Sequence, residues 1–303
     1  MPNIWTHILF VEDLCINIER DDLLATSERH LYLGAQGPDP FFYYNFWPKI
    51  KDRGVNDLGL TLHKEKCGDF LIDLIKQGAS FKNNKQAYIL GFVSHHILDR
   101  ITHPYVHYKA GYEGNKHQAL EVAIDTLMLE KHRHIQTWQT AVSPLIRLKR
   151  AERKEIASWL KPTIEKHYSP GHLPKHFIEK SFKDMAVAQR VLFDPYGWKN
   201  KWLGSMVSSF SHQPISDRAD YLNTNRYSWR HSATYEPYNE SFEDLYHQAL
   251  KEASTLFETI LDYWSPQQHT PLEKVKSLVQ HISYDTGTPL AEKHDNLYSD
   301  PIV

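Results

Sequence analysis

Apolar residues recur at intervals of three and four positions along most of the chain, the spacing that places them on one face of an α-helix. We find no run of alternating β-branched residues bounded by tight turns, which is the pattern of a half-buried strand. The sequence therefore predicts an all-α, multi-helix fold. The expected helices cover residues 3–18, 20–33, 55–78, 83–101, 116–134, 151–167, 174–193, 199–210, 241–264 and 271–282.

Clusters of Gly, Pro and Asn interrupt the helical spacing, as expected of residues that end helices. They are GAQGPDP (34–40), GYEGN (111–115), SPGHLP (169–174) and SPQQHTP (265–271). No internal repeat and no linker rich in Gly and Ser divides the chain. We therefore expect one helical domain over residues 1–288, with 135–240 as a candidate looser lobe, followed by an extended tail over 289–303.

The composition argues against a duplex nucleic-acid-binding protein, a membrane-spanning protein and a disulfide-rich protein. The 303 residues are 41% hydrophobic, and the net charge of -2 is spread over mixed acidic and basic residues, which gives no footprint for duplex nucleic acid. No run approaches the roughly 20 apolar residues of a membrane span. The N-terminus lacks the pattern of a signal peptide, so we expect a cytoplasmic protein. Peripheral contact with a membrane is compatible with the sequence. Cys15 and Cys67 are too few for a disulfide framework and are expected to be buried or idle thiols. No pattern indicates an oligomeric state.

Histidine is the unusual feature, with 19 in the chain. His95 and Asp99 are four positions apart, a spacing that places two residues only about 40° apart around a helix. His117 and Glu121 repeat the spacing on the next predicted helix. One such pair is more often a solvated surface pair, but two lie here among apolar residues, where uncompensated charge costs several kcal/mol. Imidazole and carboxylate are zinc ligands, so the two pairs predict a metal site.

Other candidates extend these pairs. His103 continues the row of His95 and Asp99 by one turn, and Pro104 is expected to end that helix. Asp125 continues the row on the second helix.

Three further candidates lie upstream: His7 in IWTHILF, Asp39 in a Gly/Pro turn, and His63 in GLTLHKEK. Each alone is more often a core or surface residue. Together they would complete a second metal position.

At these residues the sequence resembles the zinc-dependent phospholipase C family, whose all-helical fold is shared with fungal single-strand nucleases. The resemblance rests on HHILD followed by HPYVH, on HQALE shortly afterwards, and on an early His, a loop Asp and a helical His in that order. By motif it covers roughly residues 1–130. It implies a multi-helix single domain of the zinc-dependent phospholipase C type.

The resemblance also implies two zinc ions and a third, uncertain metal position. The implied ligands of the first zinc are Asp39, His63, His95 and Asp99. The carboxylate of Asp99 is placed to bridge to another ion. The implied ligands of the second zinc are His117, Glu121 and a histidine after Asp99. His7 resembles the family's N-terminal histidine, which helps to hold the third metal.

Two departures from the family pattern matter. In the secreted phospholipases the third metal also uses the amino group and carbonyl of an N-terminal Trp created by processing, whereas this chain begins MPNIW without an evident cleavable segment. The third position is therefore expected to be incomplete or closed by another ligand. The family's later histidine stands two residues after the Pro, where this chain has Val106. We favour His103, which continues the helical row, and keep His107 as the alternative ligand.

The implied chemistry is hydrolysis of a phosphodiester or phospholipid. Zinc makes water reactive near neutral pH and neutralises phosphoryl oxygens, and Asp39 is expected to orient or deprotonate that water as general base. Asp125 is expected to fix an imidazole tautomer. The run FFYYNFW (41–47) is expected to pack in the core, and the loop 221–231 is either a phosphate-binding loop or an ordinary surface loop.

Two other functions stay open at this point. A nuclease of the same fold would need a positively charged groove and aromatic side chains that stack on the bases of single-stranded nucleic acid. No run of basic residues is evident in the sequence. A non-catalytic zinc-binding protein would saturate its metal with protein ligands, whereas a catalytic site keeps one position open. A di-iron bundle fits poorly because it uses ExxH motifs.

Overall fold

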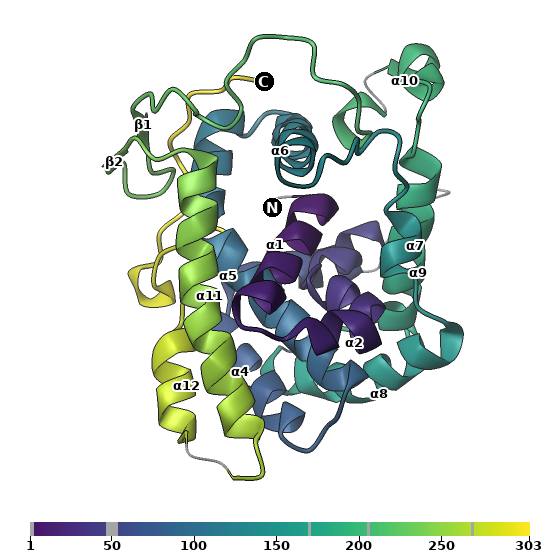
Figure 1. The fold of residues 1–303 in the computed structure, drawn as a ribbon, viewed down its shortest axis with the longest axis vertical. Helices are drawn as coiled ribbons and strands as arrows, with labels where there is room; N and C mark the ends of the chain where they lie inside the picture. The colour runs from purple at the N-terminus through teal and green to yellow at the C-terminus, as the bar shows by residue number, and fades with distance from the viewer. Residues whose placement is uncertain (1–2, 47–53, 169–170, 205–206, 268–269) are drawn as a thin grey trace.

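The computed structural model describes residues 3–46, 54–168, 171–204, 207–267 and 270–303. Within them the chain is an assembly of helices with a small two-stranded antiparallel sheet (Figure 1), so the all-α prediction is confirmed. The α-helices are α1 (Ile4–Asn17), α2 (Asp21–Gly34), α3 (Val55–Lys64), α4 (Cys67–Gly78), α5 (Asn84–Ala110), α6 (Lys116–Arg133), α7 (Ser143–Ile146), α8 (Arg150–His167), α9 (Phe177–Leu192), α10 (Trp198–Leu203), α11 (Phe242–Trp264) and α12 (Leu272–Val279). The 3-10 helices and strands are η1 (Asp39–Tyr43), η3 (Ser208–Phe210), η4 (Leu290–Glu292), β1 (Trp229–Arg230) and β2 (Pro237–Tyr238).

The helix α5 is the centre of the fold. It is 27 residues long and packs against α1, α2, α4, α6 and α11. Most of its residues from Ala87 onward are buried, polar ones included. A helix buried around its whole circumference belongs to the interior rather than to an amphipathic outer layer. The ionisable residues of α5 are thereby carried into the core.

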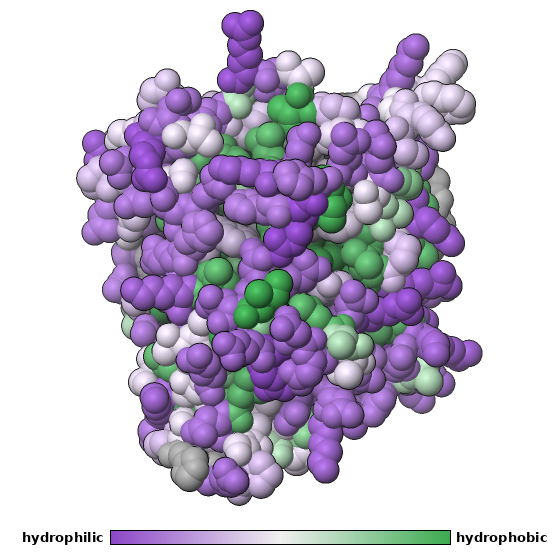
Figure 2. All heavy atoms as spheres, in the orientation of Figure 1, coloured by the Kyte–Doolittle hydropathy of each residue, from purple (hydrophilic) through white to green (hydrophobic). Residues whose placement is uncertain are grey.

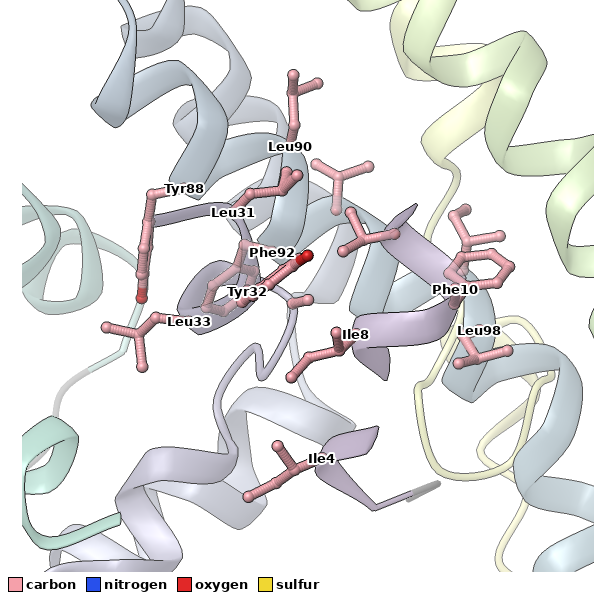
Figure 3. Packing of buried hydrophobic residues seen from close by; sticks show 14 of the residues in the cluster. Ile4, Ile8, Phe10, Leu31, Tyr32, Leu33, Tyr88, Leu90, Phe92 and Leu98 are labelled. Carbon is pink, nitrogen blue, oxygen red and sulfur yellow. The ribbon is translucent and has the colours of Figure 1, made fainter. Parts of the chain in front are cut away.

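The helices α1, α2 and α5 form the middle of the hydrophobic core. Figure 3 shows Phe10 of α1, Leu31 of α2 and Leu98 of α5 in this cluster, and each is fully buried. A Cβ atom on Gly91 would lie 2.2 Å from the carbonyl oxygen of Leu31 and 2.6 Å from the amide nitrogen of Ala35. A side chain at position 91 would clash with α2. The glycine therefore allows α2 and α5 to approach closely, with Ala35 against α5.

The outer helices present a polar surface. Hydrophilic side chains cover most of the face in Figure 2, and hydrophobic groups are visible between them. On α11 the buried positions recur at intervals of three and four residues, as expected of an amphipathic outer helix. Its start is fixed by Ser241 and Asp244, each side chain accepting a hydrogen bond from the other's backbone amide.

The helix predicted for residues 83–101 is longer in the structure, and the expectation that Pro104 ends it is wrong. The helix α5 continues to Ala110. Proline removes only one helical hydrogen bond, while the residues beyond it, such as the fully buried Tyr105, still pack in the core. Consequently His107 lies on the same helix as the residues predicted to bind metal.

Two other predicted helices also differ from the structure. The helix expected over 55–78 is divided into α3 and α4, because Lys66 has a φ of 49° that a helix cannot contain. The helix expected over 271–282 ends before Gln280, whose φ is 58°. Hydrophobic spacing continues across both positions, so periodicity alone could not reveal these breaks.

The helix expected over 199–210 is found in part, as α10 and η3, and residues 205–206 between them lie outside the described part of the chain. Residues 169–170 and 268–269 of the predicted turns also lie outside it. The four-residue α7 and the two-residue strands were not predicted, because elements this short carry no measurable period.

The segment after residue 289 runs along the end of α5. The amide of Asp300 donates a hydrogen bond to the carbonyl oxygen of Tyr108 at 2.8 Å. Buried residues of every described α-helix except α10 belong to one main hydrophobic cluster. The division into a domain (1–288), a looser lobe (135–240) and a tail (289–303) stays a prediction.

In the described part of the chain, no helix is both long enough and apolar enough to cross a membrane. Cys15 and Cys67 are both buried and free, as expected.

Candidate metal centre

Four ionisable residues follow one another at four-residue intervals along α5: His95, Asp99, His103 and His107. Each step of four advances about 40° beyond a full turn, so the row winds slowly across one side of the helix. The side chains of His95 and Asp99 are 0% exposed, whereas those of His103 and His107 are 3% and 14% exposed. The row therefore leads from the interior toward the surface.

At the buried end, His7 of α1 meets His95 and Asp99. Nε2 of His7 lies 3.3 Å from Oδ1 of Asp99, and Nε2 of His95 lies 3.0 Å from Oδ2 of the same carboxylate. The rings of His7 and His95 are stacked with centroids 4.2 Å apart. Nε2 of His103 is 3.7 Å from Oδ2 of Asp99. One buried carboxylate thus faces three imidazoles.

Asp39 and His63 approach His95 from two other elements. Asp39 begins η1, directly after the GAQGP turn, and His63 lies in the last turn of α3. Oδ1 of Asp39 is 3.3 Å from Nε2 of His63 and 3.8 Å from Nε2 of His95. Ligand-type atoms of these three residues lie within 4.8 Å of one another, as do those of His7, His95 and Asp99. His95 therefore belongs to both clusters.

Backbone carbonyls determine which nitrogen of His95 and His63 carries the proton. Nδ1 of His95 is 3.0 Å from the oxygen of Ala35, and Nδ1 of His63 is 2.7 Å from the oxygen of Gly59. A carbonyl oxygen can only accept, so Nδ1 donates and Nε2 of each neutral ring carries a lone pair. These lone pairs face carboxylate oxygens, which is repulsive unless a proton or a cation lies between them. Metal-binding histidines are oriented in this way.

Gly37 makes room for the ring of His95. Its φ is +50°, and a Cβ atom there would lie 2.2 Å from Cδ2 and 2.8 Å from Nε2 of His95. The turn needs glycine for its backbone conformation and for the space that the imidazole occupies. The same turn places Asp39 two residues later.

The second predicted pair lies on α6, which packs against α5. Nε2 of His117 is 2.6 Å from Oε1 of Glu121, and the two side chains are 19% and 8% exposed. Ligand-type atoms of these residues and of His103 lie within 4.8 Å of one another. The structure therefore brings the two pairs predicted from their spacing to one place, and His103 connects them.

The alternative ligand His107 lies at the same end of the centre. Its Nε2 is 2.8 Å from Oδ1 of Asp285, and ligand-type atoms of His103, His107 and Asp285 also lie within 4.8 Å of one another. The rings of His107 and His117 have centroids 4.7 Å apart. His103 and His107, the two alternative ligands predicted from the sequence, therefore both lie at this end of the centre.

Sequence reasoning missed two residues of the centre, Tyr284 and Asp285, which follow α12. The ring of Tyr284 is 1% exposed and packs on the ring of His96, with centroids 4.4 Å apart. A loop has no period, and nothing in the sequence relates position 285 to position 107. The one available signal was a carboxylate close to a glycine and a proline, in YDTGTP (284–289), as Asp39 is in GAQGPDP.

Many polar atoms of the centre are buried and have no hydrogen-bond partner in the described part of the chain. They are both ring nitrogens of His7 and His103, Nε2 of His95, Nδ1 of His107, Oδ1 of Asp39 and both carboxylate oxygens of Asp99. Each unsatisfied buried group costs about 1–3 kcal/mol, so the arrangement calls for a compensating ligand. Imidazole nitrogens and carboxylate oxygens are the donors that zinc takes. The residues therefore fit zinc, at more than one position.

Burial and neighbouring charges put His103, His117 and Asp99 in metal-binding protonation states, whereas His95 would have to release a proton to bind a metal. Burial lowers the pKa values of His103 and His117 well below the ordinary value, so both rings are neutral. Burial opposes the charged form of His95, but the carboxylates of Asp99 and Asp39 outweigh it and raise its pKa. Burial opposes ionisation of Asp99, yet His103 and His95 hold its pKa well below the usual range. Neutral imidazoles and an ionised carboxylate are the forms that bind a metal.

Asp125 contacts the start of α1. Its carboxylate accepts hydrogen bonds from the backbone amides of Trp5 at 3.0 Å and Thr6 at 2.8 Å, and from the Thr6 hydroxyl. A negative charge is favourable at a helix N-terminus. The imidazole within reach is that of His212, at 3.2 Å, which belongs to none of the clusters described above. Asp125 is therefore linked to the centre through α1, which carries His7.

Within the aromatic run, residues 41–46 are described, and they pack partly in the core and partly against the centre. Phe41 and Tyr44 are buried, and the ring of Phe42 is stacked on that of His63 with centroids 5.5 Å apart. Residue 47 lies outside the described part of the chain.

The arginines of loop 221–231 have partners within the protein. Arg226 forms an ion pair with Asp244 at 2.8 Å, and the guanidinium of Arg230 lies over the ring of Tyr235. These contacts are typical of an ordinary surface loop.

Comparison with known families agrees with this geometry. The family model described as zinc dependent phospholipase C matches residues 6–171, which is more than half of the chain. The protein therefore belongs to the zinc-dependent phospholipase C family. Searches of curated proteins and of solved structures gave no match.

Proposed function

We propose that the protein is a zinc-dependent phosphodiester hydrolase of the phospholipase C type. The observation that carries the proposal is the row on α5. His95, Asp99 and His103 each contact ligand-type residues from other helices, so adjacent cation positions would share one framework. Membership of the zinc-dependent phospholipase C family supports the same activity.

The clusters suggest which residues would hold zinc. One position would use Asp39, His63, His95 and Asp99. A second would use His103, His117 and Glu121. A third would use His7 and Asp99. Asp99 would serve two of these positions, which is consistent with its two buried oxygens facing different imidazoles.

When bound, zinc lowers the pKa of a coordinated water toward neutrality and neutralises negative charge on phosphoryl oxygens. In the proposal Asp39 accepts the proton of the attacking water. Its side chain is 11% exposed, whereas that of Asp99 is 0% exposed, so solvent reaches Asp39 but not Asp99. The rings of Phe42 and Tyr284 both pack against the ring of His63 and limit the water around this carboxylate.

Partial exposure also favours catalysis over storage. Structural zinc sites are closed by protein ligands, and catalytic sites keep a position open to water or substrate. His107, His117 and Asp285 are 14%, 19% and 17% exposed, in contrast to the closed end at His7 and Asp99. We infer that substrate approaches from the side of His117 and Asp285.

The proposed substrate is a phospholipid or a related phosphodiester, which would require peripheral contact with a lipid surface in the first case. A nuclease is less well supported because the net charge is -2 and the arginines of loop 221–231 are engaged. A cytoplasmic location stays a prediction from the sequence.

The test is turnover by zinc-loaded protein of three substrates: phosphatidylcholine vesicles, bis(p-nitrophenyl) phosphate and single-stranded DNA. We expect hydrolysis of the first two, loss of activity with a chelator, and recovery when zinc is restored. Cleavage of the DNA alone would favour a nuclease. Bound zinc without any turnover would favour a non-catalytic zinc-binding protein.

A further inference from the structure

The loop over residues 282–289 is held in one conformation by its own hydrogen bonds. Ile282 and Pro289 form an isolated antiparallel bridge, and the amide of Ser283 donates to the carbonyl oxygen of Thr288 at 3.0 Å. The hydroxyl of Ser283 accepts from the amide of Asp285 at 3.1 Å. The direction of the Asp285 side chain is therefore set by an ordered turn rather than by a free chain end.

The same loop is fixed to two helices of the metal centre. The amide of Tyr284 donates to the carbonyl oxygen of His63, at the end of α3, at 3.1 Å. A Cβ atom on Gly287 would lie 2.2 Å from the carbonyl oxygen of Arg100 on α5. Pro104 cannot donate its helical hydrogen bond to that carbonyl, so the glycine backbone packs where the helix lacks an N–H group.

This attachment places the Asp285 carboxylate at the outer end of the row on α5. Its Oδ1 is 2.8 Å from Nε2 of His107, and its Oδ2 is 3.1 Å from Nζ of Lys64. Ligand-type atoms of Asp285, His107 and His103 lie within 4.8 Å of one another. Both nitrogens of His103 and Nδ1 of His107 are buried without a hydrogen-bond partner among the described residues.

We propose that Asp285, His107 and His103 form a further divalent-cation position, so that the loop after α12 completes the metal centre. The proposal rests on the proposed function and adds a ligand set to the same centre. Two imidazoles and one carboxylate are a ligand combination that zinc accepts, and the 14% and 17% exposure of His107 and Asp285 leaves the fourth direction open to water. Asp285 lies outside residues 6–171, the part of the chain that the family model matches.

The position explains why α5 carries two histidines after Asp99. His103 is also grouped with His117 and Glu121 on α6, so the position built with Asp285 is adjacent to the position built with α6. Within this arrangement His107 belongs only to the position built with Asp285, whereas His103 is common to both groups.

A second cluster in the protein also combines an aspartate, a histidine and a lysine, but it is not part of a metal-binding group among the described residues. Asp73 is 2.7 Å from Nε2 of His167 and also pairs with Lys166, just as Asp285 pairs with His107 and Lys64. The carboxylates of Asp73 and Asp285 are 12% and 17% exposed. Among the described residues Asp73 belongs to no group that could hold a metal. It therefore provides a matched control for an Asp–His–Lys cluster that is only an ion pair.

The experiment uses the full chain, stripped with a chelator and reloaded with zinc, and measures bound zinc per chain and its affinity by competition with a zinc indicator. We expect Asp285→Asn and His107→Gln each to remove the weakest zinc or to weaken it by at least about 10- to 100-fold, the range found for changes near a metal. Asp73→Asn should leave zinc content and affinity unchanged. Equal zinc binding by Asp285→Asn and the unaltered protein would overturn the proposal.

The variant Lys64→Met separates a ligand from an ion pair. It keeps the Asp285 carboxylate and removes a competing cation, so zinc should bind as tightly as before or more tightly. If Lys64→Met instead weakens zinc as much as Asp285→Asn does, the carboxylate acts only through the ion pair and the proposal is wrong. An unaltered protein that binds no zinc would refute the proposed function itself, which is a distinct result.

Discussion

Nε2 of His95 lies 3.0 Å from Oδ2 of Asp99, and neither side chain is exposed. Because Nδ1 of His95 donates to the carbonyl oxygen of Ala35, the atom facing Asp99 is a lone-pair nitrogen whenever the ring is neutral. A lone pair and a carboxylate oxygen repel at this distance. The contact is favourable only with a proton or a cation between the two atoms, and the proposed zinc would supply the cation.

Replacing Asp99 should therefore remove metal. Asp99→Asn keeps the shape of the side chain but exchanges one carboxylate oxygen for an NH₂ group, which does not bind zinc. Because Asp99 faces three imidazoles, we expect the loss of zinc from two positions. Elemental analysis after gel filtration in buffer without zinc measures the loss.

Asp125→Asn is the control for that variant, since Asp125 is equally buried and 0% exposed. It should retain more zinc than Asp99→Asn. It should also lower the melting temperature, because weakened hydrogen bonds to the amides of Trp5 and Thr6 cost about 1–3 kcal/mol. Equal loss of zinc from the two variants would show that the assignment of these carboxylates is wrong.

Gly37→Ala should damage the centre without changing a ligand. The new methyl group would meet the ring of His95 at 2.2 Å, and alanine at a φ of +50° adds backbone strain. Gly114→Ala is matched for strain, with a φ of +54°, but has nothing within 4 Å of the added atom. We expect Gly114→Ala to cost about 1 kcal/mol of unfolding free energy and Gly37→Ala to cost about 1–3 kcal/mol more and to lose zinc. Similar effects of the two substitutions on stability and zinc would contradict this account of the turn.

The sequence made the two His–carboxylate pairs of the centre predictable, because residues four positions apart on a helix point in nearly the same direction. The interval of four, repeated among apolar residues, predicts His95 with Asp99 and His117 with Glu121, and the structure brings both pairs together. The error at Pro104 had a local cause. A proline predicts the end of a helix, whereas the buried packing beyond it keeps α5 helical to Ala110.

The positions of His107, Tyr284 and Asp285 in the centre could not be predicted in the same way. With α5 assumed to stop, His107 had no place in the row, although it follows His103 by four residues. Asp285 approaches His107 from a loop that is fixed by contacts with α3 and α5, and such contacts leave no periodic trace in a sequence. Tyr284, which packs on His96, was missed for the same reason.

Asp39→Asn separates catalysis from metal binding. If Asp39 accepts a proton from the attacking water, turnover should fall by about 10²- to 10⁴-fold. Zinc should largely remain, because His63, His95 and Asp99 still hold it. Steady-state hydrolysis of bis(p-nitrophenyl) phosphate and elemental analysis should be carried out on the same preparation. A variant that loses zinc in proportion to activity would instead show that Asp39 acts mainly as a ligand.

Protonation of His231 should make the protein less stable in acid. Burial lowers its pKa to about 4, and its Nδ1 accepts hydrogen bonds from the amides of Ala233 and Thr234. The unfolded chain binds the proton near the ordinary pKa of about 6.5. The contribution of His231 is therefore complete above about pH 6.5 and is lost toward pH 4, at up to about 1.4 kcal/mol per pH unit.

Urea unfolding of the metal-free protein at several pH values measures this effect. His231→Gln keeps an acceptor oxygen without a titrating group, so the stability of the variant should fall less steeply over the same range. Identical slopes for the variant and the unaltered protein would show that His231 does not take up a proton on unfolding.

The most direct test of the central claim is a zinc titration of the metal-free protein in which bound zinc and phosphatidylcholine hydrolysis are measured on the same samples. We expect hydrolysis to be absent without zinc and to rise as about two ions bind per chain, because adjacent cations together activate water and neutralise the phosphate. A protein that is saturated with zinc but hydrolyses neither phosphatidylcholine nor a soluble phosphodiester between about pH 6 and 8 would contradict it.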